Sequence, residues 1–303
     1  MEQRRRQIAL SIGMVSYMEW FPSAETGSPV LLLHGGGADS AMLSWGEVAP
    51  ALADAGHRVI APDHPGFGRS PRLNAPLTQE RLVDYLAEFV DALGLDGYVV
   101  GGLSLGGGLS LGHLLTHPGR ARGAILLGTY GVMPRLTDGP FSALTHFLTF
   151  TLLRTGLLNA MTTMYSRSPT AMERGLKDIV RNEGARTPAL LAAVMVEAQK
   201  GTGLAVFGEW QRDQVLWNRL RTVYSDRLPA ITVPVLLVHG GQDRGVPPAR
   251  AEKAAASIPR SALVVVPGAG HWVQRDRPDL VIPAIIEHLR RIDDATPAGT
   301  EST

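Results

Sequence analysis

Short apolar segments alternate with segments of helical periodicity along most of this chain, and that alternation restricts the fold more than any other feature. Each apolar segment ends at Gly, Pro or Asp and is apolar almost throughout, as expected of strands buried on both faces of a parallel sheet. Strands are predicted at residues 30–33, 58–61, 98–100, 124–127, 235–238 and 262–266. Residues 79–93 are typical of the helices between them, with Thr78 as N-cap and Gly94 as the stop. The pattern predicts an α/β fold, with a mostly parallel central sheet flanked by helices.

The alternation stops between residues 133 and 230, and this break defines the expected domain organisation. The segment is mainly helical in character and rich in Leu, Met and Thr, and the strand pattern resumes at residue 231. We therefore expect an α/β core formed by residues 1–132 and 231–292, interrupted by an inserted helical lid, or cap, at residues 133–230. Small and polar residues dominate residues 293–303, which are predicted to form a disordered tail.

The composition excludes several classes of protein. Lys and Arg total 29 against 28 Asp and Glu, so the net charge of +1 provides no field for binding nucleic acid. The chain has no cysteine, which excludes disulfides, thiol catalysis and thiolate metal sites. No apolar stretch reaches the roughly 20 residues that span a bilayer, and residues 8–16 are too mixed for a signal peptide. We expect a soluble, cytoplasmic protein with no membrane partner, and leave its oligomeric state open, a homo-oligomer included.

The sequence Gly102-Leu103-Ser104-Leu105-Gly106 fits the pattern Gly-x-Ser-x-Gly of a nucleophile elbow. The pattern occurs a second time around Ser110, so the context must distinguish the two serines. Ser104 directly follows a predicted strand and precedes a predicted helix, which is the position of the sharp turn that exposes a nucleophile. Ser110 comes nearly two helical turns later and is expected inside the helix. Ser104 is therefore the predicted nucleophile.

A serine nucleophile needs a base to take its proton, and the base needs an acid to orient it. His271 follows the last predicted strand, where a loop can bring it to the carboxyl edge of the sheet. Asp243 follows the preceding predicted strand, and the order Ser104, Asp243, His271 agrees with this type of elbow. Among the other histidines, His34 is expected to brace its own loop by hydrogen bonding.

Together these residues resemble the α/β-hydrolase family over nearly the whole chain outside the lid and tail. The resemblance rests on the turn His34-Gly35-Gly36-Gly37, residues 63–70 (DHPGFGRS), the Ser104 elbow, Asp243 and Gly270-His271-Trp272. It implies an oxyanion hole formed by the backbone N–H groups of Gly36 and Leu105. Neither a metal ion nor an organic cofactor is implied.

The resemblance also implies hydrolytic chemistry on a small molecule. Because a serine occupies the elbow, the branches with a carboxylate nucleophile, haloalkane dehalogenases and epoxide hydrolases, are disfavoured. Our first expectation is a serine esterase that cleaves carboxylic esters of apolar small molecules through an acyl-enzyme. The alternative is a meta-cleavage-product hydrolase, which splits a carbon–carbon bond in a vinylogous diketo acid. Leu103 departs from that group, which commonly has Asn before the nucleophile. A binding protein without catalysis on the same fold is the third hypothesis.

The substrate is expected to lie between the lid and the core. The candidate substrate-binding residues are the apolar side chains of these two regions together with one lid arginine, which would bind a substrate carboxylate. They are Trp45, Met133, Phe141, Arg181, Trp210 and Trp272.

Overall fold

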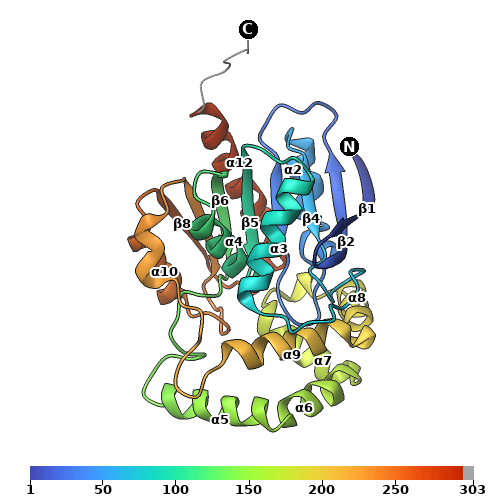
Figure 1. Ribbon diagram of the computed structural model, residues 1–303, viewed down its shortest axis with the longest axis vertical. Coiled ribbons are helices and arrows are strands. Elements are labelled where there is room, and N and C mark those ends of the chain that lie inside the picture. The colour runs from blue at the N-terminus through green and yellow to red at the C-terminus, as the bar shows by residue number, and fades with distance from the viewer. Residues whose placement is uncertain (296–303) are drawn as a thin grey trace.

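The computed structural model describes residues 1–295, which build one eight-stranded sheet covered by helices on both faces (Figure 1). The strand order is β1-β2-β4-β3-β5-β6-β7-β8. All pairs from β4 to β8 are parallel, and β1 and β2 join one edge in antiparallel fashion. The strands are β1 (Glu2–Leu10), β2 (Gly13–Phe21), β3 (Val30–Leu33), β4 (Val59–Pro62), β5 (Tyr98–Leu103), β6 (Ala121–Leu127), β7 (Val235–Gly240) and β8 (Ser261–Val266).

Alternate residues of the central strands point to opposite faces and so supply two hydrophobic clusters. In β3, Leu31 and Leu33 join the cluster beneath α3 (Gln79–Ala92) and α4 (Leu105–Thr116). Val30 and Leu32 join the cluster on the other face, formed with α2 (Val48–Asp54) and α12 (Pro278–Asp294). The remaining core helices are α1 (Ala41–Trp45), α10 (Pro248–Ser257) and α11 (Val273–Asp276). Burial on both faces explains why these strands are apolar almost throughout.

All six predicted strands are present, and their boundaries differ by no more than a few residues. The predicted helix at residues 79–93 is α3, whose N-cap Thr78 accepts a hydrogen bond from the backbone N–H of Arg81 at 3.2 Å. No strand was predicted before residue 30, yet β1 and β2 form a hairpin there. The three arginines of β1 interrupt the apolar pattern, so the sequence does not indicate this strand. Two of them are neutralised within the fold, Arg5 by Asp63 at 2.7 Å and Arg6 by Glu19 at 2.9 Å.

Between β6 and β7 the chain forms five α-helices, which we call the helical insertion. They are α5 (Ser142–Arg154), α6 (Leu157–Ser166), α7 (Pro169–Ile179), α8 (Pro188–Lys200) and α9 (Thr202–Gln214), with short 3₁₀ turns at Glu183–Ala185 and Ser225–Ala230. Figure 1 shows these helices gathered at one end of the sheet, at the bottom of the view. Among residues 1–295 no single helix is long and apolar enough to cross a membrane, although α8 and α9 together, bent by 69°, meet that criterion by length and composition.

The predicted tail begins too early. Asp293 and Asp294 belong to the last turn of α12, and Asp293 accepts hydrogen bonds from the backbone N–H and hydroxyl of Ser28, at 3.1 and 2.6 Å. These contacts tie the end of α12 to the segment before β3. Residues 296–303 lie outside the described part of the chain.

Candidate active site

Ser104 lies between β5 and α4 in a strained backbone conformation. Its φ of 52° and ψ of −111° make it the only residue other than glycine with positive φ among residues 1–295. Such conformations cost about 1–3 kcal/mol and persist where the surrounding structure imposes them. Here the Ser104 N–H donates to Leu127 O at 2.8 Å, and Ser104 O accepts from Tyr130 N–H at 3.0 Å. The turn therefore holds the hydroxyl at the carboxyl edge of the sheet, where a nucleophile elbow requires it.

The neighbouring glycines allow this turn because backbone crowds it from both sides. A Cβ atom on Gly102 would lie 2.2 Å from the carbonyl carbon of Gly106, and one on Gly106 would lie 2.2 Å from Leu33 O. Ser110, in the repeated motif, instead lies inside α4. Its side chain is buried and its hydroxyl donates to Gly106 O at 2.9 Å, so it is occupied within the helix.

Asp243 and His271 follow β7 and β8 and meet at the same edge of the sheet. His271 Nδ1 lies 2.8 Å from Asp243 Oδ2, while Asp243 Oδ1 accepts from the N–H groups of Gly245 and Val246 at 2.7 and 3.0 Å. His239 Nε2 lies 3.3 Å from Oδ2 as well. Burial acts to raise the pKa of Asp243, but the hydrogen bonds of His239 and His271 outweigh it, so this pKa lies below its usual value. The structure thus presents an ionised carboxylate beside the imidazole.

Glycines also permit the close packing of this pair. A Cβ atom on Gly128, whose φ is +48°, would lie 3.0 Å from His271 Nδ1 and 3.3 Å from Asp243 Oδ2. One on Gly245 would lie 3.2 Å from His271 Nδ1. Both positions lie against the imidazole, so a larger residue at either would displace the ring.

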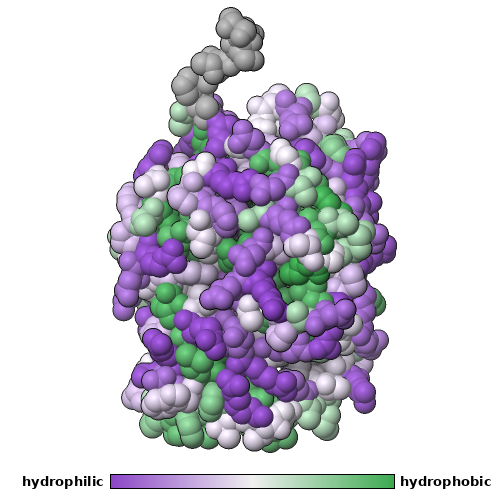
Figure 2. Space-filling view, viewed as in Figure 1, coloured by the Kyte–Doolittle hydropathy of each residue, from purple (hydrophilic) through white to green (hydrophobic). Residues whose placement is uncertain are grey.

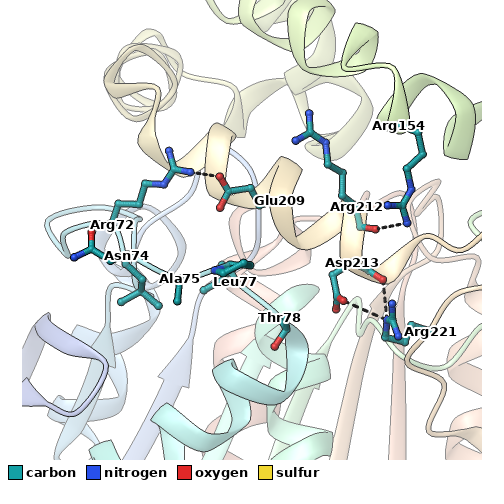
Figure 3. A pocket seen from close by; sticks show the side chains of 12 residues that line it. Arg72, Asn74, Ala75, Leu77, Thr78, Arg154, Glu209, Arg212, Asp213 and Arg221 are labelled. Carbon is teal, nitrogen blue, oxygen red and sulfur yellow. Dashed lines mark hydrogen bonds and ion pairs between the residues drawn. The ribbon is translucent and has the colours of Figure 1, made fainter.

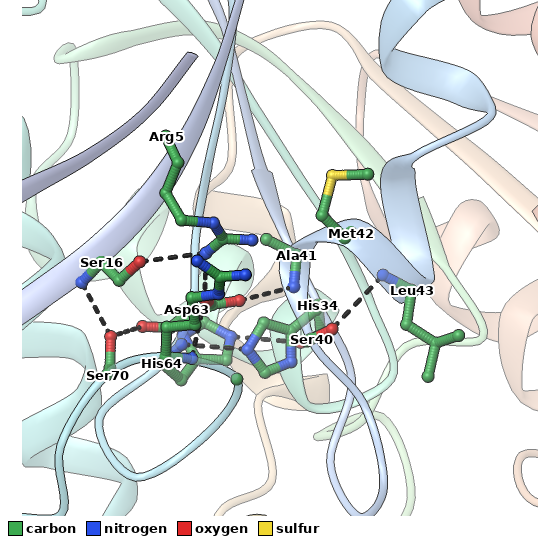
Figure 4. A network of polar contacts seen from close by, with 12 residues as sticks. Arg5, Ser16, His34, Ser40, Ala41, Met42, Leu43, Asp63, His64 and Ser70 are labelled. Atoms are coloured by element: carbon green, nitrogen blue, oxygen red, sulfur yellow. Dashed lines mark hydrogen bonds and ion pairs between the residues drawn. The ribbon is translucent and has the colours of Figure 1, made fainter. Parts of the chain in front are cut away.

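The loop with Gly36 is held by a buried polar network (Figure 4). His34 Nδ1 donates to Gly35 O at 2.7 Å, and His34 Nε2 accepts from the backbone N–H of His64 at 2.9 Å. Burial lowers the pKa of His34 to about 3, so this residue stays neutral and braces the loop, as expected. Asp63 accepts hydrogen bonds from Ala41 N–H at 2.9 Å and Arg69 N–H at 3.0 Å, which links the loop after β4 to the start of α1.

Ser104 and His271 line one mainly apolar cavity of about 260 Å³. Two of the six candidate substrate-binding residues, Met133 and Trp210, line it too, as does Leu105. Leu105 is the first residue of α4, so its N–H belongs to the free N-terminal end of that helix. Gly36 does not itself line the cavity, but its Cα lies against Phe207, which does.

The structure does not bring the other four candidates to this cavity, which corrects the expectation for each. Trp45 and Trp272 pack into the hydrophobic cluster on the α12 face of the sheet, where Trp45 is 0% exposed. Phe141 is 73% exposed. Figure 2 shows hydrophobic residues among polar ones on the surface at the end of the molecule formed by the helical insertion. The Arg181 N–H donates to Asp276 at 2.7 Å, and its guanidinium lies 3.4 Å from Asp178.

Several cavity residues were missed because nothing in the sequence marks them. Phe207 stacks on Trp210 with ring centres 5.5 Å apart, and Tyr130 meets Trp210 edge-on at 4.8 Å. Phe207 and Trp210 lie three residues apart on α9, and that spacing is the only signal of a shared face. The remaining missed residues of the lining are Leu136, Gln211, Gln214, Val215, Leu220, Gly245 and Val246. Within the described part of the chain, no three His, Asp or Glu side chains are grouped so as to hold a metal ion.

This architecture is that of the α/β-hydrolase fold, and comparison with known proteins extends the match to the sequence. The family model for the alpha/beta hydrolase fold matches residues 28–278. The chain belongs to the α/β-hydrolase fold family.

Its relatives include enzymes of more than one specificity. A 2-hydroxy-6-oxo-6-(2'-aminophenyl)hexa-2,4-dienoic acid hydrolase from Metapseudomonas resinovorans is 30% identical over 281 residues, which is 91% of this chain and 89% of that protein. Haloalkane dehalogenase 2 from Mycobacterium bovis is 29% identical over 283 residues, or 89% and 94% of the two chains. The solved structure of a thermophilic esterase from Thermogutta terrifontis is 27% identical, with a TM-score of 0.70 over 96% of this chain and 99% of that one.

Proposed function

We propose that this protein is a serine hydrolase with Ser104 as nucleophile, His271 as general base and Asp243 as orienting acid. One observation carries the proposal. His271, 2.8 Å from Asp243, shares a cavity with a serine held in a strained turn after a strand. A structural role would leave the strain at Ser104 without a purpose, whereas a nucleophile requires its hydroxyl to stand clear of the sheet.

The proposed reaction uses these groups as in other serine hydrolases with a Ser-His-Asp triad. His271 Nε2 takes the Ser104 proton as the hydroxyl oxygen attacks a substrate carbonyl carbon, and the oxyanion accepts hydrogen bonds from the N–H groups of Gly36 and Leu105. The leaving group departs with the proton from His271. His271 then takes a proton from water, which attacks the acyl-enzyme and releases the acid. Asp243 fixes the tautomer of His271 and stabilises the imidazolium between these steps.

For the bond that is cleaved, we propose the carbon–carbon bond of a vinylogous diketo acid. The relative that is 30% identical over nearly the full length hydrolyses a dienoic acid of this kind by its name, which reverses our first preference for esters.

Ester hydrolysis is the second candidate, and the cavity lining favours it. The lining includes no Asp, Glu, Lys or Arg side chain, and Leu103 replaces the Asn that commonly precedes the nucleophile in carbon–carbon hydrolases. An ester of an apolar acid would need neither an asparagine nor an arginine. The dehalogenase branch needs a carboxylate where this chain has Ser104.

One assay distinguishes hydrolysis of the carbon–carbon bond from ester hydrolysis. We expect a ring-fission dienoate to be turned over with higher kcat/KM than a short-chain p-nitrophenyl ester. A higher kcat/KM for the ester would establish the esterase instead. No turnover of either compound and no labelling of Ser104 by a serine-directed phosphonate would refute both and favour a binding protein.

A further inference from the structure

A second hollow, larger than the catalytic cavity, lies on the opposite side of α9 (Figure 3). Its volume is about 730 Å³, and it is enclosed by the loop of residues 72–78 before α3, the ends of α5 and α9, and Arg221. Glu209, Arg212 and Asp213 face this groove from α9, whereas Phe207, Trp210 and Gln214 of the same helix face the catalytic cavity. The groove is therefore distinct from the site described above.

The groove is strongly basic in a protein that is otherwise close to neutral. Its lining includes the four arginines Arg72, Arg154, Arg212 and Arg221 and only two carboxylates, Glu209 and Asp213. Four positive charges less two negative charges leave +2, which exceeds the net charge of +1 of the whole chain. The two carboxylates are already engaged. Arg72 pairs with Glu209, and Arg221 Nε lies 3.3 Å from Asp213 Oδ1.

The surplus charge belongs to Arg154 and Arg212. In residues 1–295 neither guanidinium has a carboxylate within ion-pair distance. Each is instead anchored to a carbonyl of the other's helix: Arg154 Nη2 donates to Arg212 O and Arg212 Nε donates to Leu153 O, both at 3.2 Å. The Arg154 guanidinium also lies over the Phe150 ring, 5.2 Å from its centre. Within residues 1–295 these contacts use one N–H donor of each guanidinium and leave the other donors for a ligand.

We propose that this groove binds an oxyanion, namely the carboxylate or phosphate group of a small organic molecule. Guanidinium groups present planar pairs of N–H donors that match both kinds of oxyanion. An anion in the groove would accept hydrogen bonds from the remaining donors of Arg154 and Arg212. The neutral groups along the loop, among them Leu73, Pro76 and Leu77, supply an apolar wall for the organic part.

The groove is connected to the catalytic cavity by hydrogen bonds. Asp213, which Arg221 holds, accepts from Gln214 Nε2 at 2.6 Å, and Gln214 Oε1 accepts from the Tyr130 hydroxyl at 3.1 Å. Gln214 and Tyr130 both line the cavity with Ser104.

The test is calorimetric titration of the full chain at low ionic strength with inorganic phosphate and, separately, with benzoate. We expect saturable binding of at least one, weakening as salt is added, because salt screens exposed charges. The variant Arg154→Gln/Arg212→Gln is expected to bind the probe about tenfold more weakly or worse, because both substitutions remove charge-assisted hydrogen bonds to the anion. The relative affinities for the two probes show which oxyanion the groove prefers.

The matched control is Arg290→Gln/Arg291→Gln, which removes the same charge from α12 at the other end of the molecule. It should bind as the wild type does, and thermal melting must show that both variants fold. Absence of saturable binding in the wild type, or equal binding by the groove variant, overturns the proposal. In that case Arg154 and Arg212 only cap the helices whose carbonyls they contact. A groove that binds anions in a protein without hydrolase activity would leave this proposal standing and refute only the proposed function.

Discussion

At the scale of single residues, two identical five-residue patterns take opposite roles because of what precedes each. Ser104 follows a strand and is forced into positive φ, while Ser110 lies one and two-thirds turns into α4 with its hydroxyl bonded to the backbone. The pattern alone could not separate them, but the position relative to the strand could.

Ser104→Ala is therefore expected to lower kcat for the preferred substrate by about 10³-fold or more, because the nucleophile is lost. Ser110→Ala should stay close to wild type, since it removes only a local hydrogen bond. Steady-state kinetics of the two purified variants check this, with melting temperatures as the control for folding. Full activity in Ser104→Ala would refute the assignment.

The second prediction concerns the loss of activity at acidic pH. Hydrogen bonds hold the pKa of Asp243 below its usual value, so this carboxylate stays ionised in mildly acidic solution. Activity should fall as the pH is lowered, because a general base that already carries a proton cannot accept the Ser104 proton. Asp243→Asn should lower kcat by about 10⁴-fold at its optimum, because the amide cannot hold the required tautomer.

The lowered pKa of Asp243 also determines how its contribution to the free energy of unfolding changes with pH. Asp243 stabilises the fold above the ordinary carboxyl pKa, and this contribution is lost as the pH falls through its lower folded value. The rate should therefore decline before this contribution to stability does. A rate that is flat from pH 5 to 8 would contradict the role of His271.

The residues of the cavity wall show where sequence reasoning stops. An aromatic residue packs equally well in a core, on a surface or in a pocket, and only tertiary contacts separate these outcomes. Trp45 is core, Phe141 is exposed and Trp210 lines the cavity, although the sequence treats them alike. The placement of Ser104, Asp243 and His271 was predictable, because each follows a strand at one edge of the sheet.

At the scale of elements, β1 shows how charge can hide a strand. Strand patterns are recognised by apolar residues, but an edge strand has little core to meet and gains from charges that discourage pairing with other chains. Arg4, Arg5 and Arg6 stand where β1 pairs with β2. Arg4 pairs with Glu2 in the same strand, whereas Arg5 and Arg6 pair with Asp63 and Glu19 outside it, and no local pattern reveals these two partners.

Side chains of helix α9 line three hollows: the cavity with Ser104, the groove with Arg154 and Arg212, and a third hollow. Phe207 of α9 lies between the cavity and the third hollow. Phe207 and Gln211 line both the catalytic cavity of about 260 Å³ and a neighbouring hollow of about 660 Å³. The ring also lies against Gly36, where an added Cβ would be 2.2 Å from it. Removing the ring joins the two spaces beside the proposed oxyanion hole.

Phe207→Ala should therefore raise kcat/KM for bulky substrates relative to small ones. The measurement is the ratio of kcat/KM values across a series of substrates that share a leaving group and differ in acyl size. Phe150→Ala is the matched control, because Phe150 lies on α5, packs against Phe147 and lines neither space. An unchanged ratio in Phe207→Ala would mean that the ring does not limit the space for substrate.

At the scale of the whole molecule, the alternation of strands and helices predicted the fold because it reflects burial of the sheet on both faces. The length and helical character of the insertion were also visible in the sequence. How α9 distributes its two faces between a cavity and a groove was not, because that depends on packing between segments far apart in the chain.

The buried histidines give the last prediction, which concerns folding stability. Burial lowers the pKa of His34 to about 3 and those of His113 and His288 to about 4, and the pKa of buried His64 is lowered as well. In the unfolded chain these four histidines bind protons near pH 6.5, whereas in the folded chain they stay neutral at that pH. The unfolded state therefore binds more protons in acid. Each site then reduces stability by up to about 1.4 kcal/mol per pH unit below about pH 6.5.

Asp39 opposes this effect, because burial raises its pKa to about 6 and the folded state takes its proton first. Four sites against one leave a net loss, so the free energy of unfolding should fall as the pH is lowered from about 6.5 to about 4. Urea titrations across that range measure the slope. His288→Gln keeps a side-chain donor for Ala124 O, which His288 Nε2 contacts at 3.1 Å, but cannot titrate, so its slope should be shallower than that of the wild type. Equal slopes in the variant and the wild type would show that His288 is protonated in the folded state. A wild-type slope of zero would show that the buried histidines as a group are protonated in the folded state.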